Sequence, residues 1–281
     1  MCQLSREADR VCGGPCHDWP PAVSWALLRS TLPFSDISTP VVRGLPGRSH
    51  LPYLDPVDSW PLYGIRIRTA RLELRLPDLD RLDELAQLAT RGIHDRDIMP
   101  FAKEWTDQPS PQLERSVLQH HLLQVAQWRP ERWCFNAVAI HEGRVIGCQD
   151  LESEAFAVSR RVDTASWLGR EYQGQGFGKE MRAAILHLGF FALGAEEALT
   201  FAFSDNAASI GVTRSLGYED NGTWRAVRRG RPAVRRCFRL TREGWLGQTR
   251  RPVVVEGVEP CLELFGIAPE TVMGSAEASR G

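Results

Sequence analysis

Hydrophobic and polar residues alternate in several stretches of the chain, as expected of half-buried strands. Residues 71–76 read Arg-Leu-Glu-Leu-Arg-Leu, with every second side chain apolar. Glu142-Gly143 and Arg229-Gly230 each separate two apolar-rich stretches and predict tight hairpin turns. The pattern predicts strands at 71–76, 134–140, 144–151, 162–168, 198–203, 218–227 and 233–240.

Four other stretches have apolar residues at helical spacing. Pro77-Asp78 forms a cap before Leu79, Leu82, Leu85 and Leu88, and Gly217 follows the last stretch where helices commonly end. We therefore predict helices at 79–91, 111–128, 179–193 and 206–216. The order of elements is strand, two helices, three strands, helix, strand, helix and two strands.

Composition divides the chain into three parts. Half of the 18 prolines lie at or before Pro61, so we expect residues 1–62 to be a mostly irregular extension, with at best a short helix near 22–29. The main domain is expected at 63–248. The tail, 249–281, is expected to pack partly on the domain and to fray at its end.

The overall composition is ordinary for a soluble protein, with 43% hydrophobic and 25% charged residues. Lysine and arginine number 34 against 35 acidic residues, so net charge favours neither nucleic acid nor a membrane. No uninterrupted apolar stretch is long enough to span a bilayer, and no signal-peptide pattern is present. Seven scattered cysteines suit a reducing compartment, so we expect a cytoplasmic protein without a metal site.

A glycine-rich segment, 167–179, joins a predicted strand to a predicted helix. Its glycines follow the pattern G-x-G-x-G, and Lys179 precedes Glu180, so neither the dinucleotide fingerprint nor the P-loop fits. Glycines before a helix allow backbone N–H groups to approach an anion. The segment is either a phosphate-binding loop or a turn that caps a core helix.

Two motifs together indicate a family. Gln173-x-x-Gly176-x-Gly178 resembles the pyrophosphate loop of the GNAT superfamily of N-acetyltransferases. Residues 205–209 and 216–218 resemble the Asn-x-x-Ser and Leu-Gly-Phe elements of its RimJ/RimL branch. The resemblance covers about residues 65–245, and residues 166–182 are similar to an actinobacterial subgroup that includes succinyl-CoA users.

This resemblance implies an α/β (α+β) fold. The expected sheet is mixed, mostly antiparallel, about six to seven strands wide and splayed in the middle, with about four flanking helices. The implied activity is acyl transfer from acetyl-CoA to the amine of a small molecule or protein, by direct attack in a ternary complex. Succinyl-CoA is the alternative donor, with a cation from Arg225, Arg228 and Arg229. A non-catalytic acyl-CoA sensor and a homodimer also stay open.

The resemblance also assigns residues. The residues that it implies bind the acyl-CoA donor are Leu168, Gly169, Gln173, Gly174, Gln175, Gly176, Phe177, Gly178, Lys179 and Asn206. Ser209 is expected to protonate the departing thiolate, since Thr213 replaces the tyrosine that many relatives use. Asp163 is the candidate base, and Glu152 and His121 are the alternatives. Asn206 and Ser209 could instead cap their helix, and Asp163 could be a solvated strand residue.

Overall fold

The computed structural model describes residues 59–248 and 251–268. The short helix expected near 22–29, and most of the predicted extension, lie outside these ranges. The strands are β1 Arg66–Arg68, β2 Glu73–Arg75, β3 Arg132–His141, β4 Arg144–Glu154, β5 Arg161–Leu168, β6 Glu197–Phe203, β7 Glu219–Arg228, β8 Arg231–Thr241 and β9 Val254–Glu256.

The α-helices are α1 Leu79–Thr90, α2 Gln112–Ala126, α3 Phe156–Ser159, α4 Phe177–His187, α5 Ala207–Ser215 and α6 Arg242–Leu246. Short 3₁₀ turns occupy η2 Pro61–Gly64, η3 Trp105–Asp107, η4 Arg170–Tyr172 and η6 Glu259–Phe265, and η5 Leu188–Ala192 is a π-helical turn. The four longer α-helices are the four that the sequence predicted. Within the described ranges no helix is long and apolar enough to cross a membrane.

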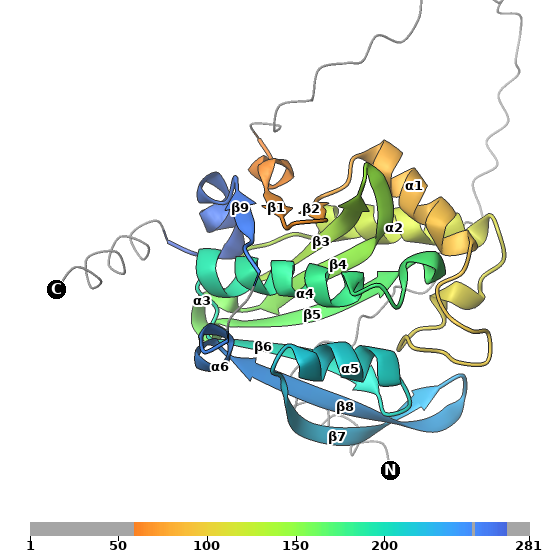
Figure 1. The fold of residues 1–281 in the computed structure, drawn as a ribbon. Helices are drawn as coiled ribbons and strands as arrows, with labels where there is room; N and C mark the ends of the chain where they lie inside the picture. Colours follow the sequence, from red (N-terminus) through yellow and green to blue (C-terminus); the bar gives the residue numbers. More distant parts are fainter. Residues whose placement is uncertain (1–58, 249–250, 269–281) are drawn as a thin grey trace, which may run out of the picture. The chain divides into compact units, whose positions relative to one another are not determined.

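The strands form one sheet in the order β7-β8-β6-β5-β4-β3-β2-β1-β9, in which β5 and β6 pair in parallel and all other neighbours are antiparallel (Figure 1). The mixed, mostly antiparallel sheet is therefore confirmed. The expected six to seven strands are too few, because the sheet has nine. The two strands that the sequence analysis did not predict, β1 and β9, have three residues each.

Each face of the sheet has its own hydrophobic core. Phe135, Ala137 and Ala139 of β3 pack in the larger core with α4. Val138, on the opposite face, packs with residues of α1 and α2 such as Leu85. Because successive side chains of a strand point to opposite faces, α1 and α2 cover one face while α4 and α5 lie on the other (Figure 1).

The two early helices begin as predicted, but their buried faces are shifted. Asp78 Oδ1 accepts a hydrogen bond from Arg81 N at 2.8 Å and caps α1. Leu79, expected in the apolar stripe of the first helix, is 65% exposed. The buried residues of α2 are Leu113, Ser116, Val117 and His121.

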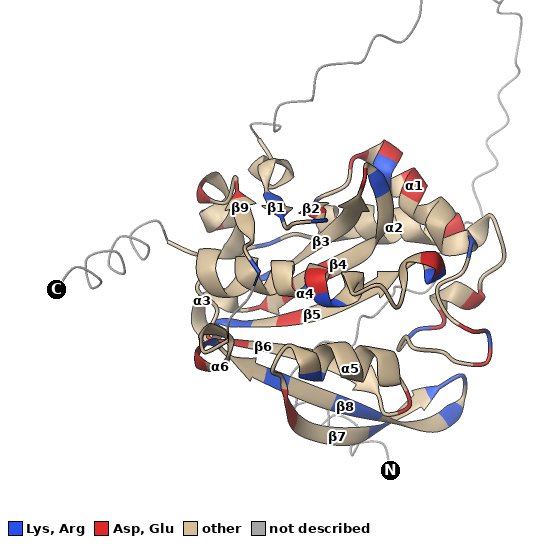
Figure 2. Cartoon of the chain, viewed as in Figure 1, with Lys and Arg blue, Asp and Glu red and all other residues tan. Residues whose placement is uncertain are grey.

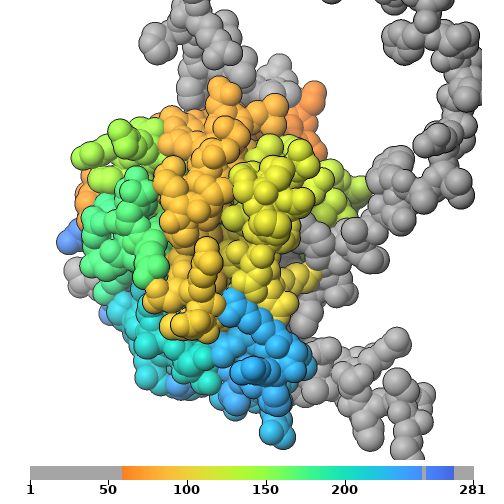
Figure 3. Space-filling model, turned by 90° about the vertical axis from the view of Figure 1, so that its right-hand side faces the viewer, coloured from red at the N-terminus to blue at the C-terminus, as the bar shows by residue number. Residues whose placement is uncertain are grey.

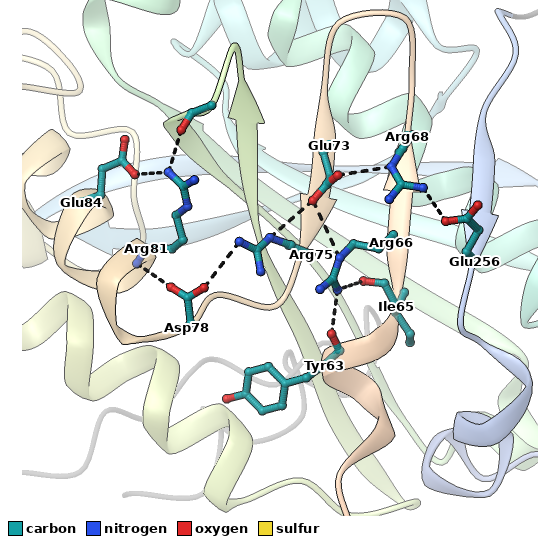
Figure 4. A network of polar contacts seen from close by, with 11 residues as sticks. Tyr63, Ile65, Arg66, Arg68, Glu73, Arg75, Asp78, Arg81, Glu84 and Glu256 are labelled. Atoms are coloured by element: carbon teal, nitrogen blue, oxygen red, sulfur yellow. Dashed lines mark hydrogen bonds and ion pairs between the residues drawn. The ribbon is translucent and has the colours of Figure 1, made fainter. Parts of the chain in front are cut away.

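Ion pairs connect the short strands at one edge of the sheet to the start of α1 (Figure 4). Arg68 of β1 pairs with Glu73 of β2 and with Glu256 of β9. Arg75 lies 3.4 Å from both Glu73 and Asp78, the residue that caps α1. This network holds the three-residue strands beside the α1 face of the sheet.

Candidate active site

The parallel pair β5 and β6 separates halfway along its length. The ladder runs from Arg161 and Glu197 to Thr164 and Thr200, and no further pair joins the ends of the two strands. At the last pair, Thr200 Oγ1 donates to Thr164 O at 2.9 Å. The splayed sheet is thus confirmed, with the opening at the carboxyl ends of two parallel strands, where ligands of open α/β sheets commonly bind.

The glycine loop lies at this opening and leads into α4 (Figure 1). Gly174 and Gly176 have φ of +73° and +81°, a backbone conformation that favours glycine. None of the backbone N–H groups of residues 174–179 donates to an acceptor within the described parts of the chain. Six consecutive donors at a helix N-terminus suit a phosphate ligand. Lys179 is exposed in the first turn of α4.

The half-buried carboxylate of Glu180 fixes the start of α4 to the segment between β1 and β2. Glu180 Oε2 lies 2.6 Å from Arg71 Nη2, and Oε1 accepts from Thr69 Oγ1 at 2.6 Å. Burial raises the pKa of the Glu180 carboxyl, but the hydrogen bonds of Thr69 and Arg71 and the Arg71 charge outweigh it, so its pKa lies below the usual value. Arg71 also donates to Gln175 O at 3.2 Å, which steadies the loop.

Several predicted donor-binding residues use their side chains to hold the loop itself. Gln173 Nε2 donates to Ile93 O at 2.6 Å and to Leu168 O at 2.9 Å. A Cβ on Gly169 would lie 2.4 Å from Leu88 Cδ1, so α1 packing already requires glycine there. The Phe177 ring is buried. At these positions only the backbone can meet a ligand.

The predicted residues of α5 include a helix cap. Asn206 Oδ1 accepts from Ser209 N at 3.0 Å, so the capping interpretation describes this oxygen correctly. Neither the Asn206 amide nitrogen nor the hydroxyl of the half-buried Ser209 forms a hydrogen bond with a described residue. Thr213 is fully buried and accepts from Arg182 Nη1 at 2.9 Å.

Carboxylates gather on the opposite face of β5. Ser166 bonds Arg182 of α4, whereas Trp167 lies 5.8 Å from Trp105 between ring centroids, on the α1 and α2 side. By alternation Asp163 also faces the α1 and α2 side. It is 6% exposed, and its Oδ1 lies 3.7 Å from Arg161 Nε. Asp163 is therefore not a solvated strand residue.

Two further acidic residues share that face. Glu152 of β4 lies directly opposite Asp163 in the register, and Asp150 lies opposite Ala165. Neighbouring negative charges repel one another across strands. Three acidic side chains thus lie close together on this face, with Arg161 beside Asp163.

His121, one of the alternative bases, lies in a different environment. It is buried at the junction of α2 and β3, where a small cavity is also lined by Tyr63, Cys134 and Asn136. Burial, together with the neighbouring His120, lowers the pKa of His121 to about 3. At neutral pH the ring is an uncharged and weak base.

The hairpin of β7 and β8 carries several basic residues (Figure 2). Two of them near the opening have carboxylate partners. Arg228 forms two hydrogen bonds with Asp205, one of 2.9 Å, and Arg229 contacts Asp107 at 2.7 and 2.9 Å. The Arg229 pair ties the hairpin to the segment before α2, and the two regions touch in the space-filling view (Figure 3). Two of the three arginines expected to meet an acyl carboxylate thus already have carboxylate partners.

Sequence reasoning missed two features of the site. The first is the contact of Arg71 and Thr69 with Glu180, whose members are more than a hundred residues apart in the chain. The second is Arg182, which is 4% exposed. Its only signal is a position four residues after Gly178, which places it on the same side of α4 as the end of the glycine loop.

Comparison with known proteins agrees with this arrangement. The model of the acetyltransferase (GNAT) domain matches residues 71–219, and the chain belongs to this family. It is therefore an acyltransferase, and acetyltransferases of the family use acetyl-CoA.

Solved structures share the fold at low identity. A T. thermophilus protein assigned as an acetyltransferase matches at 17% identity and a TM-score of 0.52, over 65% of this chain and 92% of that one. A chimera of the Vibrio cholerae spermidine N-acetyltransferase SpeG and hSSAT matches at 15% and 0.51, over 64% and 100%. A GNAT-family acetyltransferase from Bacillus anthracis matches at 14% and 0.50, over 63% and 99%.

Proposed function

We propose that the protein is an acetyl-CoA-dependent N-acetyltransferase of the RimJ/RimL type. It transfers the acetyl group to a primary amine by direct attack in a ternary complex. The observation that carries the proposal is the row of six N–H groups without described acceptors at residues 174–179, beside the opening between β5 and β6. Such a row suits the pyrophosphate of a coenzyme A thioester.

The carboxylate face supports an amine as the acceptor. A protonated amine is attracted to Asp163, Glu152 and Asp150, but it must lose a proton before it can attack. Asp163 is adjacent to Thr164, where the β5 and β6 ladder ends, so it borders the opening. We assign Asp163 as the base that accepts this proton, directly or through a water molecule.

The chemistry then needs no covalent intermediate on the protein. The amine nitrogen forms a bond to the thioester carbonyl carbon, the carbon–sulfur bond breaks, and its electron pair stays on sulfur. Asp163 passes the first amine proton on to water and then accepts the second proton, which the nitrogen loses as the carbon–nitrogen bond forms. Loop amides, the Asn206 amide nitrogen and the carboxylate face supply the positioning that brings the two substrates together.

Acetyl is favoured over succinyl because Arg228 and Arg229 are engaged by Asp205 and Asp107. The experiment that tests the proposed function assays the protein with acetyl-CoA and with succinyl-CoA against a panel of polyamines, amino sugars and peptides with free N-termini. We expect turnover with acetyl-CoA. Tight binding of coenzyme A without transfer to any amine would favour the sensor function instead.

Asp163→Asn tests the assigned base. We expect kcat to fall about 10²-fold or more, with unchanged affinity for coenzyme A because the residue faces away from the loop. Glu152→Gln on the neighbouring strand should have a smaller effect, and Asp220→Asn on the exposed part of β7 is the matched control. Equal losses in the Asp163 and Glu152 variants would remove the specific role of Asp163.

A further inference from the structure

Arg182 is a buried cation with no described anion beside it. Nη1 donates to Thr213 Oγ1 at 2.9 Å, Nη2 donates to Ser166 Oγ at 3.0 Å, and Nε has no hydrogen-bond partner in residues 59–248 or 251–268. Burial lowers the pKa of the guanidinium, but arginine remains protonated in proteins. An uncompensated buried charge is costly, so its retention points to a ligand that carries negative charge.

Arg182 lies between β5 and α5, deeper along α4 than the glycine loop. A Cβ on Gly178 would lie 3.6 Å from Leu168 Cδ1 and 3.8 Å from Val212 Cγ2, so apolar side chains surround the first turn of α4. One helical turn further along, Arg182 bridges Ser166 and Thr213. The surroundings of α4 thus change from apolar at Gly178 to polar at Arg182.

The half of β5 without a β6 partner leads from the glycine loop toward Arg182. A pyrophosphate on the loop amides would place the rest of coenzyme A along this half, residues 165–168. At about 3.3 Å per residue, this half spans roughly 13 Å. The thioester end would then lie where Arg182, Ser166 and Thr213 meet.

We propose that Arg182 stabilises the coenzyme A thiolate as it leaves, in place of a proton-donating acid. This inference rests on the proposed function, because it presumes a coenzyme A thioester at the opening between β5 and β6. When the carbon–sulfur bond breaks, the electron pair moves to sulfur and the guanidinium offsets the new charge. Thr213 accepts its hydrogen bond from Arg182 and orients it, which gives the residue at the usual tyrosine position a role without proton transfer.

The two faces of β5 favour a thiolate over an acyl carboxylate as the anion. Asp163 faces α1 and α2, whereas Ser166 and Arg182 lie on the α4 side. An amine entering from the Asp163 face pushes the leaving group toward the opposite face, where Arg182 lies. An acyl chain must remain with the amine, on the side of the carboxylates.

The decisive measurement is the pKa of the coenzyme A thiol in the complex. Thiolate absorbance in the ultraviolet is titrated for free coenzyme A and for coenzyme A bound to the full-length protein. We expect the bound thiol pKa to fall by about one unit or more below the free value. Arg182→Met should return it to the free value or above, while Arg214→Met, which changes an exposed arginine of α5, should leave the shift intact.

Stability separates this role from a structural one. Because methionine fills a similar volume without charge, we expect Arg182→Met to unfold at the same or higher denaturant concentration than wild type. Its kcat with acetyl-CoA should drop about 10²-fold at nearly unchanged coenzyme A affinity. Arg182→Lys, which keeps the charge, should recover part of both the thiol shift and kcat.

The outcomes are distinct. If wild-type protein binds coenzyme A with an unshifted thiol pKa, the role of Arg182 is overturned while the proposed function stands; this result does not depend on any variant folding. If coenzyme A does not bind at all, the proposed function itself fails. If Arg182→Met slows transfer from succinyl-CoA alone, the guanidinium serves an acyl carboxylate and the thiolate role is overturned.

Discussion

The two faces of β5 carry opposite charge in one short strand. On the α4 side, Ser166 contacts a buried guanidinium that lacks a described carboxylate partner. On the α1 and α2 side, Asp163 lies across from Glu152. One face of this strand thus presents acidic side chains, and the other contacts a buried guanidinium.

The difference is informative because the strand separates from β6 at this same point. Where the ladder is complete, residues 161–164 contribute hydrogen bonds to fold stability. Where it ends, the two faces connect through the opening. In the proposed reaction a donor on one side and an amine on the other meet between the strands, where residues 165–168 of β5 have no β6 partner.

The largest expected effect comes from Gly176→Val, which changes only the glycine loop on the α4 side of β5. We expect coenzyme A binding to weaken by about 100-fold or more, because a branched side chain at φ +81° distorts the loop amides. Isothermal titration of coenzyme A measures this. Gly143→Val, at φ +78° in the β3–β4 turn, is the matched control with similar backbone strain. If the two variants bound coenzyme A equally well, the glycine loop would not be the phosphate-binding site.

The pH dependence of stability tests His121, which lies on the α1 and α2 side of the sheet. Its pKa is about 3 in the folded state against 6.5 for an ordinary histidine, so below pH 6.5 the unfolded chain binds more protons. Its contribution to stability is complete above pH 6.5 and falls as pH drops toward 3. The free energy of unfolding should therefore decrease by about 2 kcal/mol between pH 6.5 and 5 from this residue alone.

Denaturant titrations at several pH values check this prediction. In His121→Gln the dependence between pH 6.5 and 5 should become shallower by about that amount, whereas in His94→Gln, a half-buried histidine of the segment before α2, it should persist. An unchanged slope in His121→Gln would show that the folded protein protonates this ring without penalty.

Ser209→Ala should have the smallest effect. The helix cap survives, because Asn206 accepts from the Ser209 backbone N–H, which alanine retains. We expect unchanged stability and coenzyme A affinity, with turnover slower by about tenfold at most if the hydroxyl assists the thiolate. Ser215→Ala, in the same helix, is the control. Wild-type turnover in Ser209→Ala would leave Arg182 as the candidate group at the thiolate.

Local patterns in the sequence determined the long elements. Alternation along 134–140 and 144–151, with Glu142-Gly143 between them, predicted the β3–β4 hairpin, since turn residues and strand periodicity act over a few neighbours. The glycine loop before an amphipathic helix predicted an anion site for the same reason. Strands β1 and β9 escaped prediction because their pairing joins positions almost 190 residues apart.

Only the tertiary structure decided how these elements act together. Packing of α4 against β5 and α5 buries Arg182 between Ser166 and Thr213. The register of β4 against β5 brings Glu152 to Asp163. Charge and periodicity are properties of the sequence, but burial and proximity, which set the chemistry of these groups, arise when distant segments pack together.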